Sequence, residues 1–193
     1  DLSLTKLFEE NKRKAVCNVC STIRRYVLNE YGYKKKFDYI ATGHNLSDIT
    51  AQGFNSLLSN YFIGFRNFTP VQQPNHEFKL VGRFKPLFFL TDNESKIFVE
   101  INKFPYSSDR CIFALKSPPP LYTFKKFLNS LEEERPGTLR KLAFSYIELG
   151  KRVEKFKEDK EKFKKCKICG NATAGNICLF CKLTRKYKKV KES

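Results

Sequence analysis

The stretch that decides the fold runs Phe37-Asp-Tyr-Ile-Ala-Thr42-Gly43-His44-Asn45-Leu-Ser-Asp48. Its first six residues form a short apolar run, which predicts a buried strand, and Gly43 and His44 begin the loop that follows. Asn45 is a good N-cap and Asp48 is acidic in the first turn, so we expect a helix from Asn45 to about residue 62. A strand that turns directly into a helix is the basic unit of an α/β sheet.

The same alternation continues along the chain. Residues 63–77 contain two prolines and predict a loop, and residues 78–86 predict a second strand. The capping box Thr91-Asp-Asn-Glu94 opens a second helix. Its inward side chains are expected to be Ile97, Phe98, Ile101 and Phe104. This order predicts an open α/β sheet with crossovers, in which ligands bind beyond the carboxyl ends of the strands. Gly43 and His44 are therefore candidate ligand-binding residues, although capping or packing is an equal reading of His44.

The prolines at positions 118–120 interrupt this pattern. Two more helices are expected, at about 121–134 and 138–163, separated by Pro136-Gly137. The second ends in alternating Lys and Glu, which is typical of a solvated helix or a linker. We therefore divide the chain into an α/β part at 1–117, a helical extension at 118–163 and a cysteine-rich segment with a basic tail at 164–193.

The charge of the chain indicates its class of partner. Its 193 residues hold 37 Lys and Arg against 20 Asp and Glu, a formal charge of +17. Residues 151–193 hold 15 basic and 5 acidic side chains, so they carry more than half of the excess. This predicts a polyanionic partner, with nucleic acid first. The candidate phosphate-contacting arm contains Lys182, Arg185, Lys186, Lys188, Lys189 and Lys191, and a solvated tail is the alternative.

Other classes of protein are excluded by composition. A hydrophobic content of 41% with 19 Phe is sufficient for a packed core, so the chain is not wholly disordered. No apolar run approaches the roughly 20 residues that span a bilayer, and no secretory signal opens the sequence. The chain contains no Met and begins with Asp1. We therefore expect it to be one part of a longer or split protein.

Four of the seven cysteines form a compact pattern near the end of the chain. Cys166-Lys-Ile-Cys169-Gly170 and Cys178-Leu-Phe-Cys181 are two C-x-x-C turns separated by eight residues. Two such turns facing each other make a tetrahedral thiolate site suited to structural zinc. Paired spacing and an odd total of cysteines make a poor disulfide framework. The cysteines therefore favour metal binding in a reducing compartment, the cytosol.

The other three cysteines leave alternatives open. Cys17 and Cys20 precede a helical pattern that begins at Ile23, so we expect them at or just before a helix N-terminus, which favours thiolates. This C-x-x-C pair is compatible with a redox pair, half of a second zinc site or part of an iron–sulfur site. By spacing alone, Cys111 is a lone buried cysteine.

These segments together resemble a known family. Its signatures match Cys17-Asn-Val-Cys20-Ser-Thr-Ile-Arg24-Arg25-Tyr26, Ala41-Thr-Gly-His-Asn-Leu-Ser-Asp48, Arg83-Phe-Lys-Pro-Leu87 and Phe104-Pro-Tyr-Ser-Ser-Asp-Arg-Cys111. The stretch Phe127-Leu-Asn-Ser-Leu-Glu-Glu-Glu-Arg-Pro-Gly-Thr138 and the four-cysteine knuckle complete the series. In this order they resemble the tRNA 2-thiolation enzymes of the TtuA type, in the PP-loop ATPase superfamily. The resemblance covers essentially the whole chain and implies a partial Rossmann-like open sheet, followed by helices and a zinc knuckle.

The resemblance also implies a reaction and roles for residues. Family members use ATP, with Mg, to adenylate O2 of a tRNA uridine, and a sulfur nucleophile then displaces AMP to leave 2-thiouridine. Cys17, Cys20 and Cys111 would hold a [4Fe–4S] cluster with one open iron. Asp48 matches an active-site Asp that handles a proton or orients ATP, Arg24 matches a catalytic basic position, and Gly43 and His44 would contact ATP. Implied partners are tRNA, a second copy of the complete enzyme, and a ubiquitin-like carrier or inorganic sulfide as sulfur source, in the cytoplasm.

The chain departs from the family pattern in three places. Arg24 stands where Lys is expected, and Arg cannot donate a proton at neutral pH. Ser47 stands where a second Asp is common, which weakens a metal site at that corner. The Ser-Gly-Gly-Lys-Asp-Ser loop for ATP phosphates is absent, since the sequence contains no Gly-Gly pair. We therefore expect the chain to be the C-terminal half of the enzyme, inactive alone, with the PP-loop on a further segment or chain.

Two other functions fit parts of the sequence. A zinc-stabilised RNA-binding module without catalytic activity would explain the knuckle and the charge, with Cys17 and Cys20 binding zinc or staying free. A thioredoxin-like redox protein would use Cys17 and Cys20, but it fits the α/β pattern poorly and leaves Cys111 without a role. Metal analysis separates the first of these from the thiolation enzyme, because only the enzyme requires iron.

Overall fold

The computed structural model of the chain describes residues 4–10, 15–107, 111, 113, 118–155 and 164–188. Its contacts divide into two compact units. Unit 1 contains residues 1–40, 73–83 and 159–193, and unit 2 contains residues 41–72 and 84–158. This grouping follows packing, whereas the division at 118 and 164 follows the prolines, the charge pattern and the cysteines of the sequence and stays a prediction.

Unit 1 is built around one long helix. Helix α2 spans Val16–Lys34, and the shorter α1, Leu4–Glu10, packs against it. The cysteine-rich segment folds as β4, Lys164–Lys165, paired antiparallel with β5, Ala172–Thr173, and then α8, Leu179–Lys188. A 3-10 turn, η2, covers His76–Phe78. The core of the unit consists of Leu7, Val19 and Leu183, with Phe8 and Ile23 packed around them. It therefore joins α1, α2 and α8.

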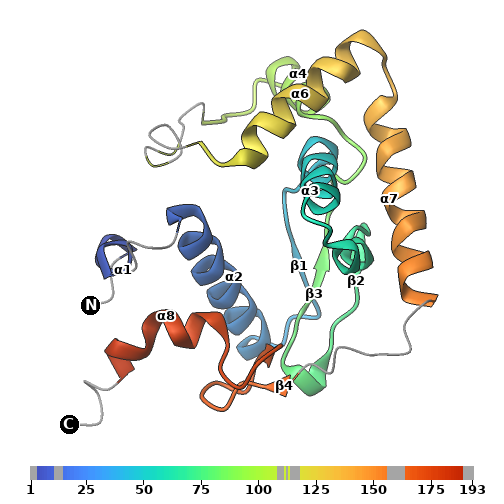
Figure 1. The fold of residues 1–193 in the computed structure, drawn as a ribbon. Helices are drawn as coiled ribbons and strands as arrows, with labels where there is room; N and C mark the ends of the chain where they lie inside the picture. Colours follow the sequence, from blue (N-terminus) through green and yellow to red (C-terminus); the bar gives the residue numbers. More distant parts are fainter. Residues whose placement is uncertain are drawn as a thin grey trace. The chain divides into compact units, whose positions relative to one another are not determined.

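Unit 2 is a helical layer around α3. Helix α3 spans Leu46–Leu58, and α6, Pro120–Glu134, and α7, Thr138–Lys155, both pack against it (Figure 1). Helix α4 spans Asp92–Ile101, and a 3-10 helix, η1, spans Phe62–Asn67. The core residues are Leu46, Ile49, Ala51, Phe65, Phe68, Phe88, Leu128, Leu139, Ala143 and Tyr146.

A small sheet has the order β1-β3-β2. Strand β1 is Tyr39–Ala41, β2 is Val71–Gln72 and β3 is Gly82–Phe84. The amide of Gly82 donates to Asp38 and the amide of Thr42 donates to Phe84, at 2.9 Å each. Because both segments advance together between these two bonds, β1 and β3 run parallel. This confirms the mixed α/β class and the crossover between the predicted strands.

Two details of the sequence expectation are wrong. The segment 63–77 is not a plain loop, since it contains most of η1, strand β2 and the start of η2. The apolar side chains of α4 do not face a core: Ile97, Phe98 and Ile101 are 47%, 59% and 75% exposed. Helix α4 is held at its N-terminus by polar contacts to α3 and α7, and no described element covers its apolar side. The predicted capping box of Thr91 and Glu94 is confirmed.

Glycines allow close approach between elements of unit 2. A Cβ on Gly53 would lie 2.1 Å from Cε2 of Tyr146, so α3 and α7 meet where only glycine fits. Gly150 similarly lies against the carbonyl of Phe65. None of the helices in the described part of the chain combines the length and apolar character that crossing a membrane requires.

Candidate metal centre and nucleotide corner

The four knuckle cysteines come together as a metal site. Their sulfur atoms all lie within 4.8 Å of one another, and Cys166, Cys178 and Cys181 are buried. The sulfurs of Cys169 and Cys178 are 3.6 Å apart. Tetrahedral zinc with Zn–S bonds of about 2.3 Å requires sulfurs about 3.8 Å apart, so the Cys169–Cys178 pair has the spacing of zinc ligands. Gly170, with φ of +78°, closes the first turn in a conformation that suits glycine.

Backbone amides stabilise the thiolate form of one of these sulfurs, that of Cys166. Burial alone would raise the pKa of Cys166, but backbone N–H groups of Cys178, Cys169 and Ile168 lower that pKa to about 6. The amide of Cys178 donates to Sγ of Cys166 at 3.3 Å. In contrast, burial raises the pKa of Cys178 and of Cys181. One thiolate is therefore formed near neutral pH, and these two thiols must release protons when a metal binds.

The knuckle is attached to α2 by an aromatic stack. The rings of Tyr26 and Phe180 lie parallel, with centroids 3.6 Å apart and an interplanar angle of 2°. Burial, followed by the charge of Cys169, raises the pKa of Tyr26. Because Phe180 lies between Cys178 and Cys181, the stack connects the metal site directly to α2. The sequence pattern gave no reason to single out Tyr26 for this contact.

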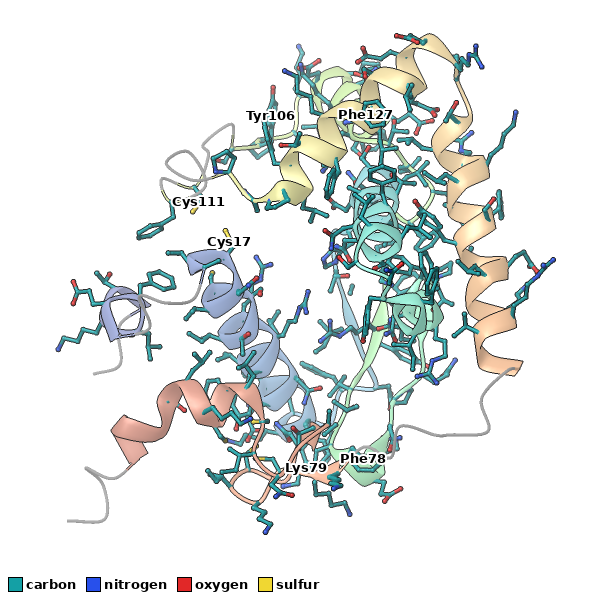
Figure 2. The ribbon with its side chains drawn as sticks, in the orientation of Figure 1. Cys17, Phe78, Lys79, Tyr106, Cys111 and Phe127 are labelled. Carbon is teal, nitrogen blue, oxygen red and sulfur yellow. The ribbon has the colours of Figure 1, made fainter. Side chains whose placement is uncertain are left out.

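Cys17 and Cys20 lie inside α2 rather than before it. The helix begins at Val16, with Ala15 as its N-cap, so Cys17 is in the first turn and Cys20 follows three residues later (Figure 2). Their spacing places both thiols on the same side of the helix. Both side chains are half-buried free thiols. The expected position at the helix N-terminus is therefore confirmed for Cys17, whereas Cys20 lies one turn further in because the helix starts upstream of its apolar pattern.

Cys111 belongs to unit 2 and is an exposed free thiol. The reading of Cys111 as a lone buried residue, made from spacing alone, is wrong. The surrounding residues 108–110 and 112 lie outside the described residues.

The corner between β1 and α3, residues 42–45, has the predicted helix N-cap. The side chain of Asn45 accepts from the amide of Asp48 at 3.0 Å, and Oδ2 of Asp48 accepts from the amide of Asn45 at 3.3 Å. Gly43 is exposed, with open space where a Cβ would point. His44 is half-buried, with its Nδ1 3.0 Å from Oγ1 of Thr42. The corner therefore combines a capped helix N-terminus with room above Gly43.

A lysine from the helical extension completes this corner. Nζ of Lys125 lies 2.7 Å from Asp48 and 2.9 Å from Asp92. Burial would lower the pKa of Lys125, but hydrogen bonds and charges from Asp48 and Asp92 outweigh it and raise the pKa. Sequence reasoning missed Lys125. One signal was available in the sequence. The residues three or four positions from Lys125 on its helix are not acidic, so an ion-pair partner for Lys125 has to come from another element. These residues are Leu121, Tyr122, Leu128 and Asn129.

The remaining predicted residues are placed as follows. Ser47 is fully buried and accepts from the amide of Asp92 at 3.2 Å, so it joins α3 to α4. Arg24 is exposed on α2. Lys182 is exposed on α8, and Arg185, Lys186 and Lys188 belong to its last turns. Lys189 and Lys191 lie outside the described residues.

Comparison with known proteins identifies the relationship. The chain is 31% identical over 179 residues to the tRNA-5-methyluridine(54) 2-sulfurtransferase of Thermotoga maritima, covering 93% of this chain and 57% of that protein. The Pyrococcus horikoshii enzyme of the same name is 32% identical over 185 residues, covering 94% and 57%. The chain is homologous to the tRNA 2-thiolation sulfurtransferases. The chain is also 26% identical to the cytoplasmic tRNA 2-thiolation protein 1 of Aedes aegypti, over 94% of this chain and 52% of that protein.

The fold agrees with that relationship. The U34-tRNA thiolase NcsA from Methanococcus maripaludis, solved with its [4Fe–4S] cluster, matches with a TM-score of 0.67 and 24% identity. The match covers 88% of this chain and 52% of NcsA. No protein-family model matches the chain. The chain spans about half the length of the curated relatives it matches.

Proposed function

We propose that the chain is the iron–sulfur and tRNA-binding half of a tRNA 2-thiolation sulfurtransferase. The observation that carries this proposal is homology along more than nine-tenths of the chain to enzymes named for that reaction. In the proposed reaction, O2 of a tRNA uridine attacks the α-phosphate of ATP and pyrophosphate leaves. A sulfur nucleophile then attacks C2, the C2–O bond breaks, and AMP leaves.

The proposal assigns Cys17, Cys20 and Cys111 to a [4Fe–4S] cluster. All three are free thiols, and none of them is needed by the knuckle, which supports the assignment. When bound, a cluster held by three cysteines has one iron without a protein ligand, available to the sulfur of the reaction. Cys166, Cys169, Cys178 and Cys181 would hold zinc as a structural ion.

The chain's own residues would act on ATP and tRNA. Gly43 and His44 would line the nucleotide corner, and Arg24 would supply a permanent positive charge to a phosphate or to the developing oxyanion. Both oxygens of Asp48 already accept hydrogen bonds, from Asn45 and Lys125. This favours an orienting role for Asp48 over proton transfer. Lys182, Arg185, Lys186, Lys188 and Lys189 would contact tRNA phosphates.

We further propose that a segment or chain carrying the PP-loop completes the enzyme. Apolar side chains on α2 support this, because Val27, Leu28 and Tyr31 are 53%, 45% and 57% exposed. Exposed apolar surface of this kind marks an interface. A homodimer, a ubiquitin-like sulfur carrier or inorganic sulfide as donor, and a cytoplasmic location stay predictions of the family relationship.

Anaerobic reconstitution with iron and sulfide tests the cluster. The chain should gain the broad visible absorbance of a thiolate-bound cluster, and Cys111→Ser should lose it while keeping one zinc. Cys166→Ser serves as the matched control, because it should lose zinc but retain the cluster ligands. One zinc and no iron in the reconstituted wild-type protein would instead support the RNA-binding module.

A further inference from the structure

Unit 1 carries most of the positive charge of the chain. Its residues include 22 Lys and Arg against 9 Asp and Glu, whereas unit 2 has 15 against 11. The predicted basic tail explains only part of this excess. Two other arginines of unit 1, Arg25 on α2 and Arg83 on β3, have a relationship that the proposed function does not use.

A buried asparagine fixes the helix that carries Arg25 to the strand that carries Arg83. Asn29 donates from Nδ2 to the carbonyl of Lys79 at 2.8 Å, and its Oδ1 accepts from the amide of Val81 at 3.1 Å. Its side chain is 8% exposed. Gly32 lies against Val81 at the same contact, where a Cβ would be 3.3 Å from Cγ2. Figure 2 labels Lys79, whose carbonyl accepts the bond from Asn29, beside Phe78.

This contact between α2 and residues 79–81 determines where Arg25 and Arg83 lie. Arg25 lies one helical turn before Asn29, on the same helix face. Arg83 is the middle residue of β3 and lies two residues after Val81, and side chains two positions apart in an extended segment leave it on the same side. The two positive charges act on each other, since burial and then the charge of Arg25 lower the pKa of Arg83. Arg83 is half-buried and Arg25 is exposed.

No acidic group neutralises this pair within the described residues. The ion pairs found there use Lys34, Lys96, Lys125, Arg140 and Lys151. The nearest carboxylate along α2, Glu30, is bound by Lys34 at 3.2 Å. A half-buried guanidinium beside a second one is costly unless an anion is bound, because buried charges are normally paired.

We infer that Arg25 and Arg83 form a binding site for one phosphate group, held between helix α2 and strand β3. Guanidinium groups match phosphate with paired N–H donors, and two of them facing one anion make a clamp. The phosphate belongs to a tRNA backbone or to a nucleotide. The inference deepens the proposed function and rests on it for the identity of the anion, but the clamp itself is a property of unit 1.

Binding of the 193-residue chain to tRNA and to ATP tests the clamp without any activity. Arg25→Gln and Arg83→Gln should each weaken binding of the anion about tenfold, as expected for a charge-assisted hydrogen bond. If the anion is tRNA, the salt dependence of log K should also flatten by about 0.7 to 0.9 for the lost phosphate. Arg152→Gln removes the same charge from an exposed site on α7 and should change both quantities little.

The double variant decides whether the two arginines share one phosphate. Shared binding predicts that Arg25→Gln/Arg83→Gln loses little more than the weaker-binding single variant, whereas independent charges would add. Weakening for tRNA alone assigns the site to RNA, and weakening for ATP alone assigns it to a nucleotide. Variants that match Arg152→Gln in both assays would overturn the clamp. Weakening for both anions also supports the clamp, because both carry the phosphate group. If the wild-type chain binds no tRNA, the proposed tRNA role fails; if it binds neither tRNA nor ATP, the clamp fails too.

Folding of the variants is controlled separately. Thermal unfolding should show Arg25→Gln as stable as wild type, because Arg25 is exposed. If Arg83→Gln unfolds, Arg25→Gln still tests the site. Arg83→Lys keeps the charge without the paired donors, and it should bind with intermediate affinity.

Discussion

Lys125 on α6 binds Asp48 on α3 at 2.7 Å, across 77 residues of sequence. The same ammonium group binds Asp92 at the first position of α4, so one side chain joins three helices of unit 2. Its exposed fraction is 25%, so solvent screens the ion pairs only in part. The contact makes the helical extension part of the corner that contains Asp48.

Lys125→Met should lower the free energy of unfolding by about 1–2 kcal/mol, because it leaves two carboxylates without their cation. The folded-state pKa of Lys125 is raised, so this contribution is fully present below the unfolded value of about 10.4 and disappears as pH rises through the folded value. Urea unfolding at pH 7 measures the contribution of Lys125 to the free energy of unfolding, and urea unfolding above pH 10.5 measures its disappearance. Lys126→Met is the control, and equal effects of the two variants would contradict the role of Lys125.

Gly53→Ala should destabilise unit 2 by about 2–4 kcal/mol, because the added methyl overlaps the buried ring of Tyr146 and forces α3 and α7 apart. Chemical denaturation measures the change. Gly175→Ala is a matched control, since nothing lies within 4 Å of its Cβ position. Shrinking the ring in Gly53→Ala/Tyr146→Leu should recover part of the loss. A neutral Gly53→Ala would show that the helices do not meet there.

Zinc binding by the knuckle should weaken steeply as pH falls. The pKa values of Cys178 and Cys181 are raised, so protons compete with the metal for these sulfurs well above pH 7, while Cys166, at about 6, competes only in acid. Competition with a chelator at several pH values measures proton release. Cys181→Ser should abolish stable zinc binding, whereas Cys111→Ser should keep it. Affinity that is independent of pH between 6 and 8 would contradict the thiol assignment.

Tyr26→Ala should destabilise unit 1 by about 2–3 kcal/mol through loss of the ring stack on Phe180 and its buried area. Tyr26→Phe keeps the stack and should cost less than about 1 kcal/mol. The same alanine variant should release zinc faster, because Phe180 lies between two ligands. Thermal unfolding and zinc release together test this. Unchanged zinc release in Tyr26→Ala would show that the knuckle holds its metal independently of α2.

The basic arm is best tested by substitution rather than deletion. Leu183 and Thr184 on α8 are buried, so removing residues 182–193 would also remove part of the core of unit 1. Changing Lys182, Arg185, Lys186, Lys188 and Lys189 to Gln should flatten the salt dependence of tRNA binding, by about 0.7–0.9 for each lost phosphate contact. The same number of Gln substitutions on unit 2 is the control. An unchanged slope would exclude the arm as a tRNA contact.

The sequence alone predicts those features of the structure that depend on residues close together in the chain. The caps at Asn45 and Thr91 and the two C-x-x-C turns follow from patterns a few residues long, and the pairing of the strands follows from the order of strands and helices along the chain. Helix α2 begins upstream of its apolar pattern, so Cys17 lies at its N-terminus as expected but Cys20 does not, because the first turn has no apolar periodicity. The face of α4 was assigned to a core because amphipathic spacing shows which side is apolar and not whether anything covers it.

Only the tertiary structure decided which distant side chains meet. Lys125 reaches Asp48, Tyr26 stacks on Phe180, and Asn29 fixes α2 to the strand that carries Arg83. None of these pairs is encoded by local spacing, since each depends on how helices pack after their own hydrogen bonds are made. The sequence by itself therefore determined the local elements and the ligand types. Packing determined which charges are neutralised within the described chain and which, like Arg25 and Arg83, are left for an anion.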